Sequence, residues 1–253
     1  MTWILDLDGV VWLADQAIPG SAEAVARLRG RGERVGVVTN NSAMTVVGYV
    51  EKLERMGLAT AAEDIVTSAQ VAATMIEPGE RVVLCAGPGV REALDARGAE
   101  VVDPTTTGAA RERADAVIVG WTRDFDYALL TAAMLAVRAG ARLIGTNDDA
   151  TYPTPGGVLP GGGSLVAAVA YASGTTATFA GKPHPPMIAA VQARFGVIDV
   201  MVGDRPSTDG LLAHGLGARF GLVLSGVTTA ADLPVTPAPD LTAADRAALV
   251  DQT

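Results

Sequence analysis

The sequence predicts an α/β protein built on parallel β-sheet, and two observations carry this prediction. Short apolar runs alternate with helical patterns through most of the 253 residues. That alternation is typical of parallel sheets whose faces are covered by helices. Several apolar runs also end in carboxylate, hydroxyl or amide side chains, as residues 3–5 do before Asp6. Because ligands bind beyond the carboxyl ends of parallel strands, a functional site is expected at these ends.

The elements of the first half follow from the spacing of apolar residues. Short apolar runs bounded by turn or charged residues predict strands. We expect such strands at residues 3–5, 34–39, 65–66, 81–85 and 101–102. Apolar residues that recur every three or four positions predict helices. We expect helices at residues 21–31, 45–56, 69–76 and 90–96.

The second half continues the same alternation. We expect strands at residues 116–119, 142–145, 178–180, 199–202 and 219–224, and a helix at residues 127–139. Residues 150–181 carry no charged side chain, but three prolines and a glycine cluster interrupt them. They therefore lack the continuous apolar stretch of a membrane span, and we predict protein-covered loop and helix there. A proline-rich surface segment at residues 234–239 precedes a short terminal helix.

So many strands fit two α/β units better than one sheet. We predict a first domain made of residues 1–78 and 176–253, with residues 79–175 inserted as a second domain. Turn-forming residues mark both crossings, because Pro78 and Gly79 lie where the insertion begins and Gly174 lies near its end.

Composition excludes several functional classes. The net charge of −9 argues against nucleic acid or an anionic membrane as a partner. Cys85 is the only cysteine, so no disulfide can form within the chain, as in proteins of a reducing compartment. The N-terminus lacks the basic-then-apolar pattern of a secretion signal. We therefore expect a cytoplasmic protein.

The first strand end carries Asp6 and Asp8, followed by Gly9. Alternation along an extended strand places side chains i and i+2 on one side, so both carboxylates can face one site. Clustered carboxylates repel each other unless a cation lies between them, and oxygen ligands suit a hard cation such as Mg²⁺. An ordinary Asp-Gly turn is an equally weighted alternative at this point. A calcium loop does not fit, because Ala17 stands where a bidentate glutamate is needed.

The second strand end is Thr39-Asn40-Asn41-Ser42. A hydroxyl and backbone N–H groups before a helix can cradle an anion. Alternatively, Ser42 or Asn41 caps the helix expected from residue 45, and both interpretations can hold together.

The third and fourth strand ends carry Lys182 and Asp204. A lone lysine is usually a solvated surface charge, but this one follows an apolar strand and lies between a glycine and a proline. His184 in the same loop is interpreted as a loop or packing residue. Asp204 ends an apolar run, and Asp209 follows where negative charge favours the start of a helix.

Together, the four strand ends resemble the four motifs of the haloacid dehalogenase superfamily of aspartate-nucleophile phosphatases. The matching residues are Asp6-Leu7-Asp8-Gly9, Thr39-Asn40, Lys182, and Gly203-Asp204 with Asp209. The stretch from residue 144 to residue 168 is similar to the cap signature of the NagD-like class IIA phosphatases. These include phosphoglycolate, glycerol phosphate, 4-nitrophenyl phosphate and pyridoxal phosphate phosphatases. One departure is Gly210, where family members usually carry an apolar residue, and it puts the start of the following helix in doubt.

The resemblance implies a Rossmann-like parallel-sheet core with an inserted α/β cap of the C2a type. It implies Mg²⁺ bound by the Asp6 carboxylate, the Asp8 backbone carbonyl and the Asp204 carboxylate. Asp6 is the expected nucleophile, ionised without a base. Asp8 is the expected acid and base, with a pKa raised by nearby negative charge.

The same resemblance implies the substrate contacts. Thr39, the Asn40 backbone, Asn41 and Lys182 are expected to hold the phosphoryl group, and Asp209 is expected to orient Lys182 or a metal-bound water. Three cap residues are candidates for contacting the substrate, with a purely structural turn as the equally weighted alternative. They are Asn147, Asp149 and Tyr152.

The expected activity is therefore Mg²⁺-dependent hydrolysis of a small phosphate monoester through an aspartyl-phosphate. A phosphomutase or phosphotransferase of the same superfamily remains an alternative, as does a phosphometabolite-binding protein without turnover. The expected partner is a small phosphorylated metabolite, and a homodimer through the cap is a further expectation.

Overall fold

The computed structural model describes residues 1–102, 113–154 and 157–252. Contacts between residues divide the chain into two compact units. Unit 1 consists of Met1–Thr39, Val46–Val66 and Lys182–Thr253, and unit 2 consists of Asn40–Thr45 and Thr67–Gly181. The sequence analysis placed the ends of the inserted domain between residues 78 and 79 and between residues 175 and 176, and these boundaries stay a prediction.

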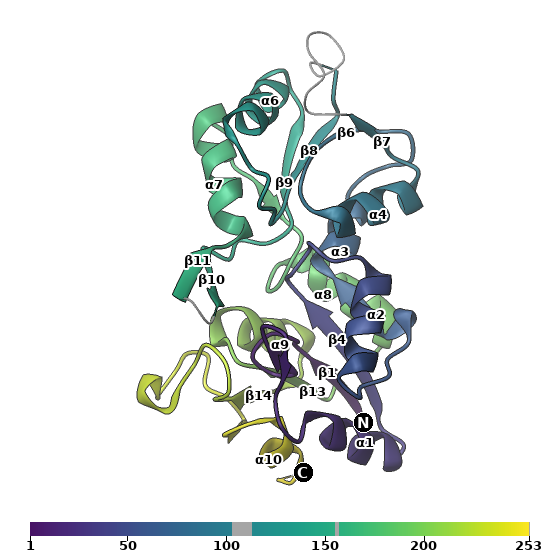
Figure 1. Ribbon diagram of the computed structural model, residues 1–253, viewed down its shortest axis with the longest axis vertical. Helices are drawn as coiled ribbons and strands as arrows, with labels where there is room; N and C mark the ends of the chain where they lie inside the picture. Colours follow the sequence, from purple (N-terminus) through teal and green to yellow (C-terminus); the bar gives the residue numbers. More distant parts are fainter. Residues whose placement is uncertain (103–112, 155–156, 253) are drawn as a thin grey trace. The chain divides into compact units, whose positions relative to one another are not determined.

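Unit 1 is built on a sheet with the strand order β15-β14-β13-β1-β4-β5. Figure 1 labels β14, β13, β1 and β4 of this sheet. These strands are β1 (Thr2–Leu5), β4 (Arg34–Thr39), β5 (Ile65–Thr67), β13 (Val200–Gly203), β14 (Arg219–Val223) and β15 (Leu241–Ala243). β1 runs parallel to both of its neighbours, and its last residue, Leu5, lies opposite Val37 of β4 and Val202 of β13. This register brings the carboxyl ends of three strands to the same edge.

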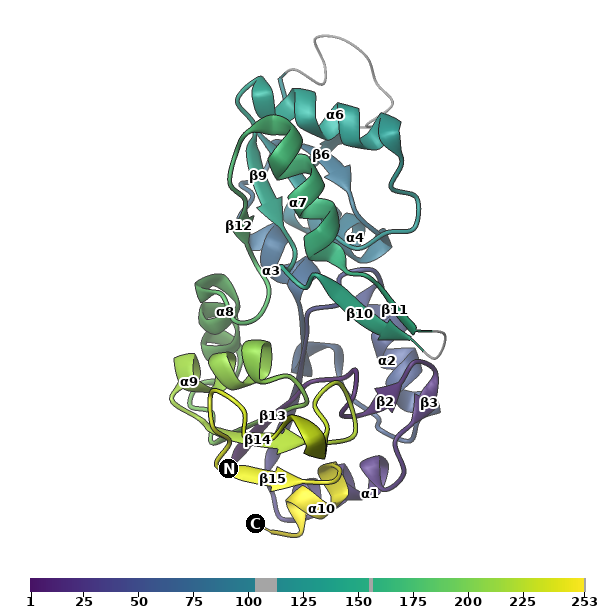
Figure 2. The same ribbon diagram turned by 90° about the vertical axis from the view of Figure 1, so that its left-hand side faces the viewer.

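Five helices in the described residues of unit 1 accompany its sheet, and four of them pack in two pairs. They are α1 (Ser21–Gly30), α2 (Val46–Arg55), α8 (Pro185–Phe195), α9 (Leu211–Leu216) and α10 (Arg246–Val250). α1 contacts α10, and α8 contacts α9, as both views show (Figures 1 and 2). A small antiparallel hairpin, β2 (Trp12–Leu13) and β3 (Gln16–Ala17), follows β1.

Unit 2 has its own parallel sheet, with the order β12-β9-β8-β6-β7. Its strands are β6 (Arg81–Cys85), β7 (Glu100–Val102), β8 (Ala116–Val119), β9 (Arg142–Gly145) and β12 (Thr178–Phe179). Its helices are α3 (Ser68–Thr74), α4 (Pro88–Arg97), α6 (Tyr127–Arg138) and α7 (Gly162–Ser173). α6 packs beside α7 and α3 beside α4 (Figure 2). A hairpin of β10 (Thr151–Thr154) and β11 (Gly157–Pro160) precedes α7.

The predicted fold class, an α/β protein with two parallel sheets, is confirmed. The strands of both sheets lie within two residues of their expected positions, apart from β15, which the sequence analysis did not anticipate. α8 and the two hairpins were also not anticipated, because proline or very short pairing hides their pattern. Among the described residues, the structure contains no helix with the length and apolar character needed to cross a membrane.

Candidate active site

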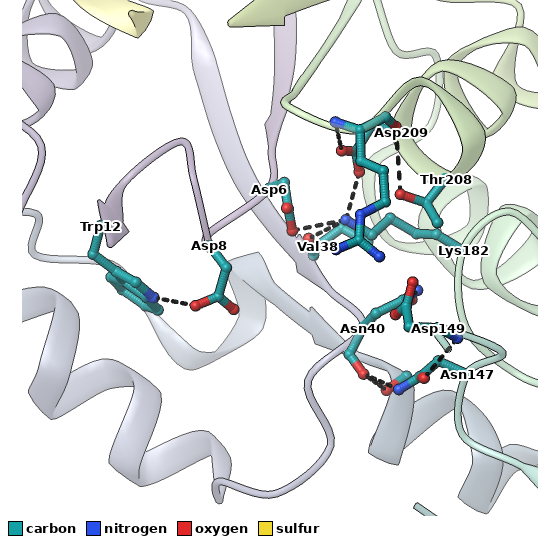
Figure 3. Close-up of polar contacts among 12 residues, drawn as sticks. Asp6, Asp8, Trp12, Val38, Asn40, Asn147, Asp149, Lys182, Thr208 and Asp209 are labelled. Atoms are coloured by element: carbon teal, nitrogen blue, oxygen red, sulfur yellow. Dashed lines mark hydrogen bonds and ion pairs between the residues drawn. The ribbon is translucent and has the colours of Figure 1, made fainter. Parts of the chain in front are cut away.

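Lys182 is the centre of a buried ion-pair chain in unit 1. Its Nζ lies 2.7 Å from Asp6 Oδ1 and 2.6 Å from Asp209 Oδ1 (Figure 3). The same Nζ lies 3.5 Å from the carbonyl oxygen of Val38 at the end of β4. The Lys182 residue is 2% exposed, so its charge is held by protein groups rather than by water. The lysine is therefore a fixed part of the site and not a surface charge.

The two carboxylates keep this buried ammonium charged. Burial alone lowers the pKa of a lysine, because desolvation disfavours the charged form. For Lys182 the charges of Asp209 and Asp6 and their hydrogen bonds outweigh desolvation, and the pKa lies above its ordinary value. A permanent positive charge thus contacts the carboxylate expected to act as the nucleophile.

Asp204 lies in the same cluster. One carboxylate oxygen from each of Asp6, Asp204 and Asp209 lies within 4.8 Å of the other two. The Asp204 Oδ2 atom accepts a hydrogen bond of 2.6 Å from the backbone N–H of Val227. Gly9 has a φ of +81°, and a Cβ there would lie 2.3 Å from Asp204 Oδ2. Only glycine lets the chain after β1 approach this carboxylate so closely.

The electrostatics of the cluster fit a bound cation. Desolvation is the largest cause that raises the pKa of Asp6 well above its ordinary value; Lys182 opposes the rise, and Asp209 and Asp204 add to it. Desolvation, followed by the charge of Asp209, raises the pKa of Asp204 to about 6. Buried carboxylates that repel each other are stabilised by a divalent ion, and an all-oxygen donor set suits Mg²⁺. The residues therefore fit the expected metal.

Asp209 lies on an unusual turn. Residues Pro206–Gly210 form a π-helical turn, and α9 begins only at Leu211. Turns of this kind occur frequently at functional sites. The turn buries Asp209 completely, and its Oδ2 accepts the backbone N–H of Arg205 at 3.1 Å. A Cβ at Gly210 would lie 2.8 Å from Pro237 Cγ, which explains why glycine replaces the expected apolar residue.

Asp8 lies beyond the strand, unlike the extended geometry expected from the sequence. β1 ends at Leu5, and Asp8 forms an isolated bridge with Trp12. Asp8 Oδ1 accepts a 2.8 Å hydrogen bond from the indole Nε1 of Trp12 (Figure 3).

The expectation for the Asp8 pKa is correct in direction and wrong in cause. The pKa is raised mainly by desolvation among the surrounding protein atoms, not by negative charge, and the Trp12 bond and the cations Lys52, Lys182 and Arg205 oppose the rise. Because the Asp8 residue is itself exposed at the surface, water reduces this desolvation.

Thr39 ends β4 and is 1% exposed. Its side chain shares a hydrogen bond with the hydroxyl of Tyr49 on α2, whose pKa is raised mainly by desolvation and also by the charges of Asp8 and Asp6. Sequence analysis did not identify Tyr49, because a tyrosine on an amphipathic helix is an ordinary core residue. Tyr49 lies ten residues after Thr39 in the sequence, and this spacing does not predict that the two side chains meet.

Asn41 and Ser42 belong to unit 2, and Thr45 rather than either of them directly precedes α2. α2 begins at Val46, so the capping role expected for Ser42 or Asn41 is wrong. Ser42 Oγ instead lies 3.0 Å from Thr146 Oγ1, in the buried part of unit 2. Asn41 Oδ1 accepts the backbone N–H of Ala43 at 3.1 Å, which forms a local turn.

Within unit 2, Asn147 and Asp149 form hydrogen bonds, and Tyr152 contacts another aromatic ring. Asn147 is 4% exposed, and its amide donates to the Asn40 carbonyl at 2.8 Å and accepts from the Asp149 N–H at 3.1 Å. These bonds make Asn147 the centre of a structural turn (Figure 3). Asp149 Oδ2 accepts the Asn40 side-chain amide at 3.0 Å. The Tyr152 ring meets that of Trp121 edge to face, at 5.5 Å between centroids.

His184 precedes α8, and its side chain makes no capping hydrogen bond to that helix. The backbone groups that hold Asp204 also escaped the sequence analysis, since backbone donors leave no trace in residue identity.

Comparisons with known proteins agree with this geometry. Residues 3–100 match the family model of haloacid dehalogenase-like hydrolases, and residues 179–249 match a second model of HAD-like hydrolases. The glycerol-3-phosphate phosphatase of Gallus gallus is 35% identical over 251 residues, covering 90% of this chain and 80% of the relative. The acid sugar phosphatase of Staphylococcus haemolyticus is 35% identical over 237 residues, covering 91% and 88%.

A solved structure is similar along nearly the whole chain. The glycerol phosphate phosphatase of Mycobacterium tuberculosis, solved in complex with magnesium, has a TM-score of 0.88 and 33% identity, covering 98% of this chain and 75% of that one. Sequence identity, fold and the convergence of the four motifs agree. The chain belongs to the haloacid dehalogenase-like hydrolases, among the phosphatases of their NagD-like class IIA group.

Proposed function

We propose that this chain hydrolyses a small phosphate monoester by transferring the phosphoryl group to Asp6 and then to water. The observation that carries this proposal is the contact between Asp6 and the buried Lys182 ammonium, beside two further buried carboxylates. A phosphoryl transition state is anionic, so positive charge placed around it supplies most of the catalysis.

Asp6 is the proposed nucleophile because its carboxylate is buried, fixed by Lys182 and located at a strand end. Attack on phosphorus forms an aspartyl-phosphate and divides one difficult step into two. Burial raises the pKa of Asp6, and the charges of Asp209 and Asp204 add to the rise, whereas Lys182 opposes it. Lys182 and a bound cation together favour the ionised nucleophile.

Asp6, the Asp8 carbonyl and Asp204 are the proposed ligands of Mg²⁺. The bound ion would supply positive charge to the phosphoryl oxygens and to the Asp6 carboxylate. Asp209 contacts Lys182 directly, and we propose that it holds the ammonium in place rather than acting on substrate.

Asp8 is the proposed acid and base. In the first step its carboxyl group gives a proton to the leaving oxygen as the bond from phosphorus to that oxygen breaks. In the second step a water molecule attacks the aspartyl-phosphate, and Asp8 takes the proton from that water as the Asp6–phosphorus bond breaks. The raised pKa of Asp8 favours the protonated form that begins this cycle.

The remaining proposed contacts are those of the phosphoryl group and of the leaving group. Thr39, the backbone of Asn40 and Asn41 are proposed to hold phosphoryl oxygens. Asp149 and Tyr152 are proposed to contact the leaving group, whereas the bonds of Asn147 indicate that it shapes their loop.

A polyol or sugar phosphate is the proposed substrate class. Two relatives carry the names glycerol-3-phosphate phosphatase and acid sugar phosphatase. A carboxylate such as Asp149 accepts hydrogen bonds from hydroxyl groups and repels a second negative charge. Glycerol phosphate should therefore be preferred over phosphoglycolate, and Asp149→Asn should narrow this preference. An unchanged ratio of kcat/KM for the two substrates would remove Asp149 from the proposal.

The activity is tested by phosphate release with Mg²⁺ and with excess chelator. The substrate panel contains glycerol phosphate, phosphoglycolate, sugar phosphates, nucleotides and pyridoxal phosphate. We expect Mg²⁺-dependent release that is abolished by Asp6→Asn and retained by Asp64→Asn, a matched change at a partly exposed aspartate of unit 1. An Asp6→Asn protein as active as the parent contradicts the mechanism. Transfer of phosphate to a second hydroxyl instead of water would favour the phosphomutase alternative.

The binding partner, the cellular location and the oligomeric state are also proposals. We propose a small phosphorylated metabolite as the partner, in the cytoplasm, and a homodimer formed through the cap. Light scattering of the purified chain and of unit 2 surface variants tests the dimer, which a monomeric mass would contradict.

A further inference from the structure

Trp12 is an unexpected hydrogen-bond donor at the proposed acid. Its indole Nε1 lies 2.8 Å from Asp8 Oδ1, although sequence analysis gave Trp12 no role. The Trp12 residue is only 2% exposed, whereas Asp8 is exposed. A rigid buried donor therefore meets a carboxyl group that water can reach.

The backbone fixes Trp12 relative to Asp8. The Trp12 N–H donates to the carbonyl of Leu7 at 3.2 Å, and the Trp12 carbonyl accepts the N–H of Gly9 at 2.8 Å. Trp12 also pairs with Ala17 in the β2–β3 hairpin. Bonds on both sides of Asp8 thus connect the tryptophan to the loop that carries the carboxyl group.

A lysine covers the tryptophan ring. Lys52 Nζ lies 4.3 Å from the centroid of the Trp12 ring, in cation–π geometry. The same Nζ donates to the Ala14 carbonyl at 2.9 Å and to Asp15 Oδ1 at 3.2 Å. The Lys52 side chain is only 12% exposed. The ammonium therefore connects α2 to the hairpin and restrains the ring.

Lysine is rare in this chain. Lys52 and Lys182 are its only lysines, and arginine supplies every other basic side chain apart from the two histidines. Lys182 contacts the proposed nucleophile, and Lys52 covers the aromatic ring that contacts the proposed acid.

The indole determines which oxygen of Asp8 can hold the proton. An indole N–H can only donate, so the oxygen that it contacts must act as an acceptor. When Asp8 is protonated, the bond favours Oδ1 as the carbonyl oxygen, which is the stronger acceptor, and the proton on Oδ2. When Asp8 is ionised, the same bond keeps the carboxylate in the same orientation, so Oδ2 stays available for the returning proton.

We propose that Trp12, supported by Lys52, is a positioning residue that presents Oδ2 of Asp8 to the leaving oxygen. This inference rests on the proposed function, because it assumes that Asp8 delivers a proton. The proton moves from Oδ2 to the leaving oxygen as that oxygen separates from phosphorus, and the attacking water returns one to Oδ2. Trp12 exchanges no proton and contacts no substrate.

The test uses leaving groups that differ in their need for a proton. Glycerol phosphate releases a basic alkoxide that must be protonated, whereas 2,4-dinitrophenyl phosphate releases a stable anion. Trp12→Phe keeps an aromatic ring and removes the donor. We expect its kcat/KM for glycerol phosphate to fall about tenfold, the scale of losing one hydrogen bond to a charged group. Its kcat/KM for the dinitrophenyl ester should stay within about twofold, because only positioning of the proton has changed.

Two further variants keep this test interpretable. Trp3→Phe removes an indole bonded to Glu33 in the same unit and should leave both substrates unaffected. Lys52→Met should reproduce the selective loss at smaller size, and it carries the test if Trp12→Phe does not fold. Equal losses on both substrates, or full activity on glycerol phosphate, overturn the proposal. A parent protein inactive on both substrates would instead contradict the proposed function, so the two failures are distinguishable.

Discussion

Replacing Lys182 with methionine removes the buried positive charge between Asp6 and Asp209 while keeping most of the side-chain volume. The Lys182, Asp6 and Asp209 side chains are 2%, 11% and 0% exposed, so water cannot replace the lost ammonium. Removing one partner of a buried ion pair costs about 3–5 kcal/mol of folding free energy, because the remaining charge is uncompensated. In a chain of this length, that loss corresponds to a fall in Tm of about 6–20 °C.

Protonation of a carboxyl group should relieve part of this loss. The pKa of Asp6 is raised by burial even with Lys182 present, and removing the lysine raises it further. A carboxyl group whose folded pKa lies above its unfolded pKa destabilises the fold at high pH. That destabilisation disappears as the pH falls through the folded pKa. The difference in Tm between parent and Lys182→Met should therefore be largest near neutral pH and smaller in acid.

The assay is thermal unfolding of the metal-free proteins across this pH range. Arg81→Met is the control, because the Arg81–Glu100 pair involves a glutamate that is 63% exposed. Such a pair contributes at most about 1 kcal/mol. A Lys182→Met loss no greater than that of the control, or one independent of pH, would refute the buried ion-pair reasoning.

Three further predictions concern the metal site and the phosphoryl contacts. The pKa of Asp204 is raised to about 6 in the protein without metal, and Mg²⁺ binds only the ionised carboxylate. The rise in Tm caused by Mg²⁺ should therefore be small near about pH 5 and grow until about pH 7. A rise in Tm that does not depend on pH would contradict this. Gly9→Ala should weaken the activation of the enzyme in a Mg²⁺ titration, because the added Cβ would lie 2.3 Å from Asp204 Oδ2. Gly32→Ala is the control: Gly32 has a similar φ of +74°, and an added Cβ would meet no atom of the described residues within 4 Å. This control should lower stability and leave the activation by Mg²⁺ unchanged. Tyr49→Phe removes the hydroxyl that bonds to Thr39 and should weaken inhibition by inorganic phosphate about fivefold, which corresponds to a loss of about 1 kcal/mol. An unchanged inhibition constant would show that this hydrogen bond is dispensable.

The sequence predicted the convergence of Asp6, Thr39, Lys182 and Asp204 because their positions follow from topology. Asp6 and Asp204 directly follow β1 and β13, Thr39 ends β4, and parallel pairing places the ends of these strands at one edge of the sheet. Lys182 was harder to place, since it follows the short β12 of unit 2 and reaches Asp6 from the segment before α8. Its resemblance to a motif, rather than its local pattern, identified it.

The contacts that refine the site could not be predicted in the same way. The bond from Trp12 to Asp8 depends on a hairpin of two-residue strands, too short to produce an alternating pattern. The contact of Tyr49 with Thr39 depends on how α2 packs, and that of Val227 with Asp204 uses a backbone N–H. Desolvation likewise depends on the surrounding atoms, so the cause of the raised Asp8 pKa was wrong although its direction was correct.

The most direct test of the central claim is chemical trapping of the phosphorylated protein. The protein is mixed with substrate and Mg²⁺, quenched in acid during turnover and reduced with borohydride, which converts an aspartyl-phosphate to homoserine. Mass spectrometry of the peptides should locate homoserine at position 6 in the parent and nowhere in Asp6→Asn. Homoserine at another aspartate, or sustained turnover by Asp6→Asn without a trapped intermediate, would contradict Asp6 as the nucleophile.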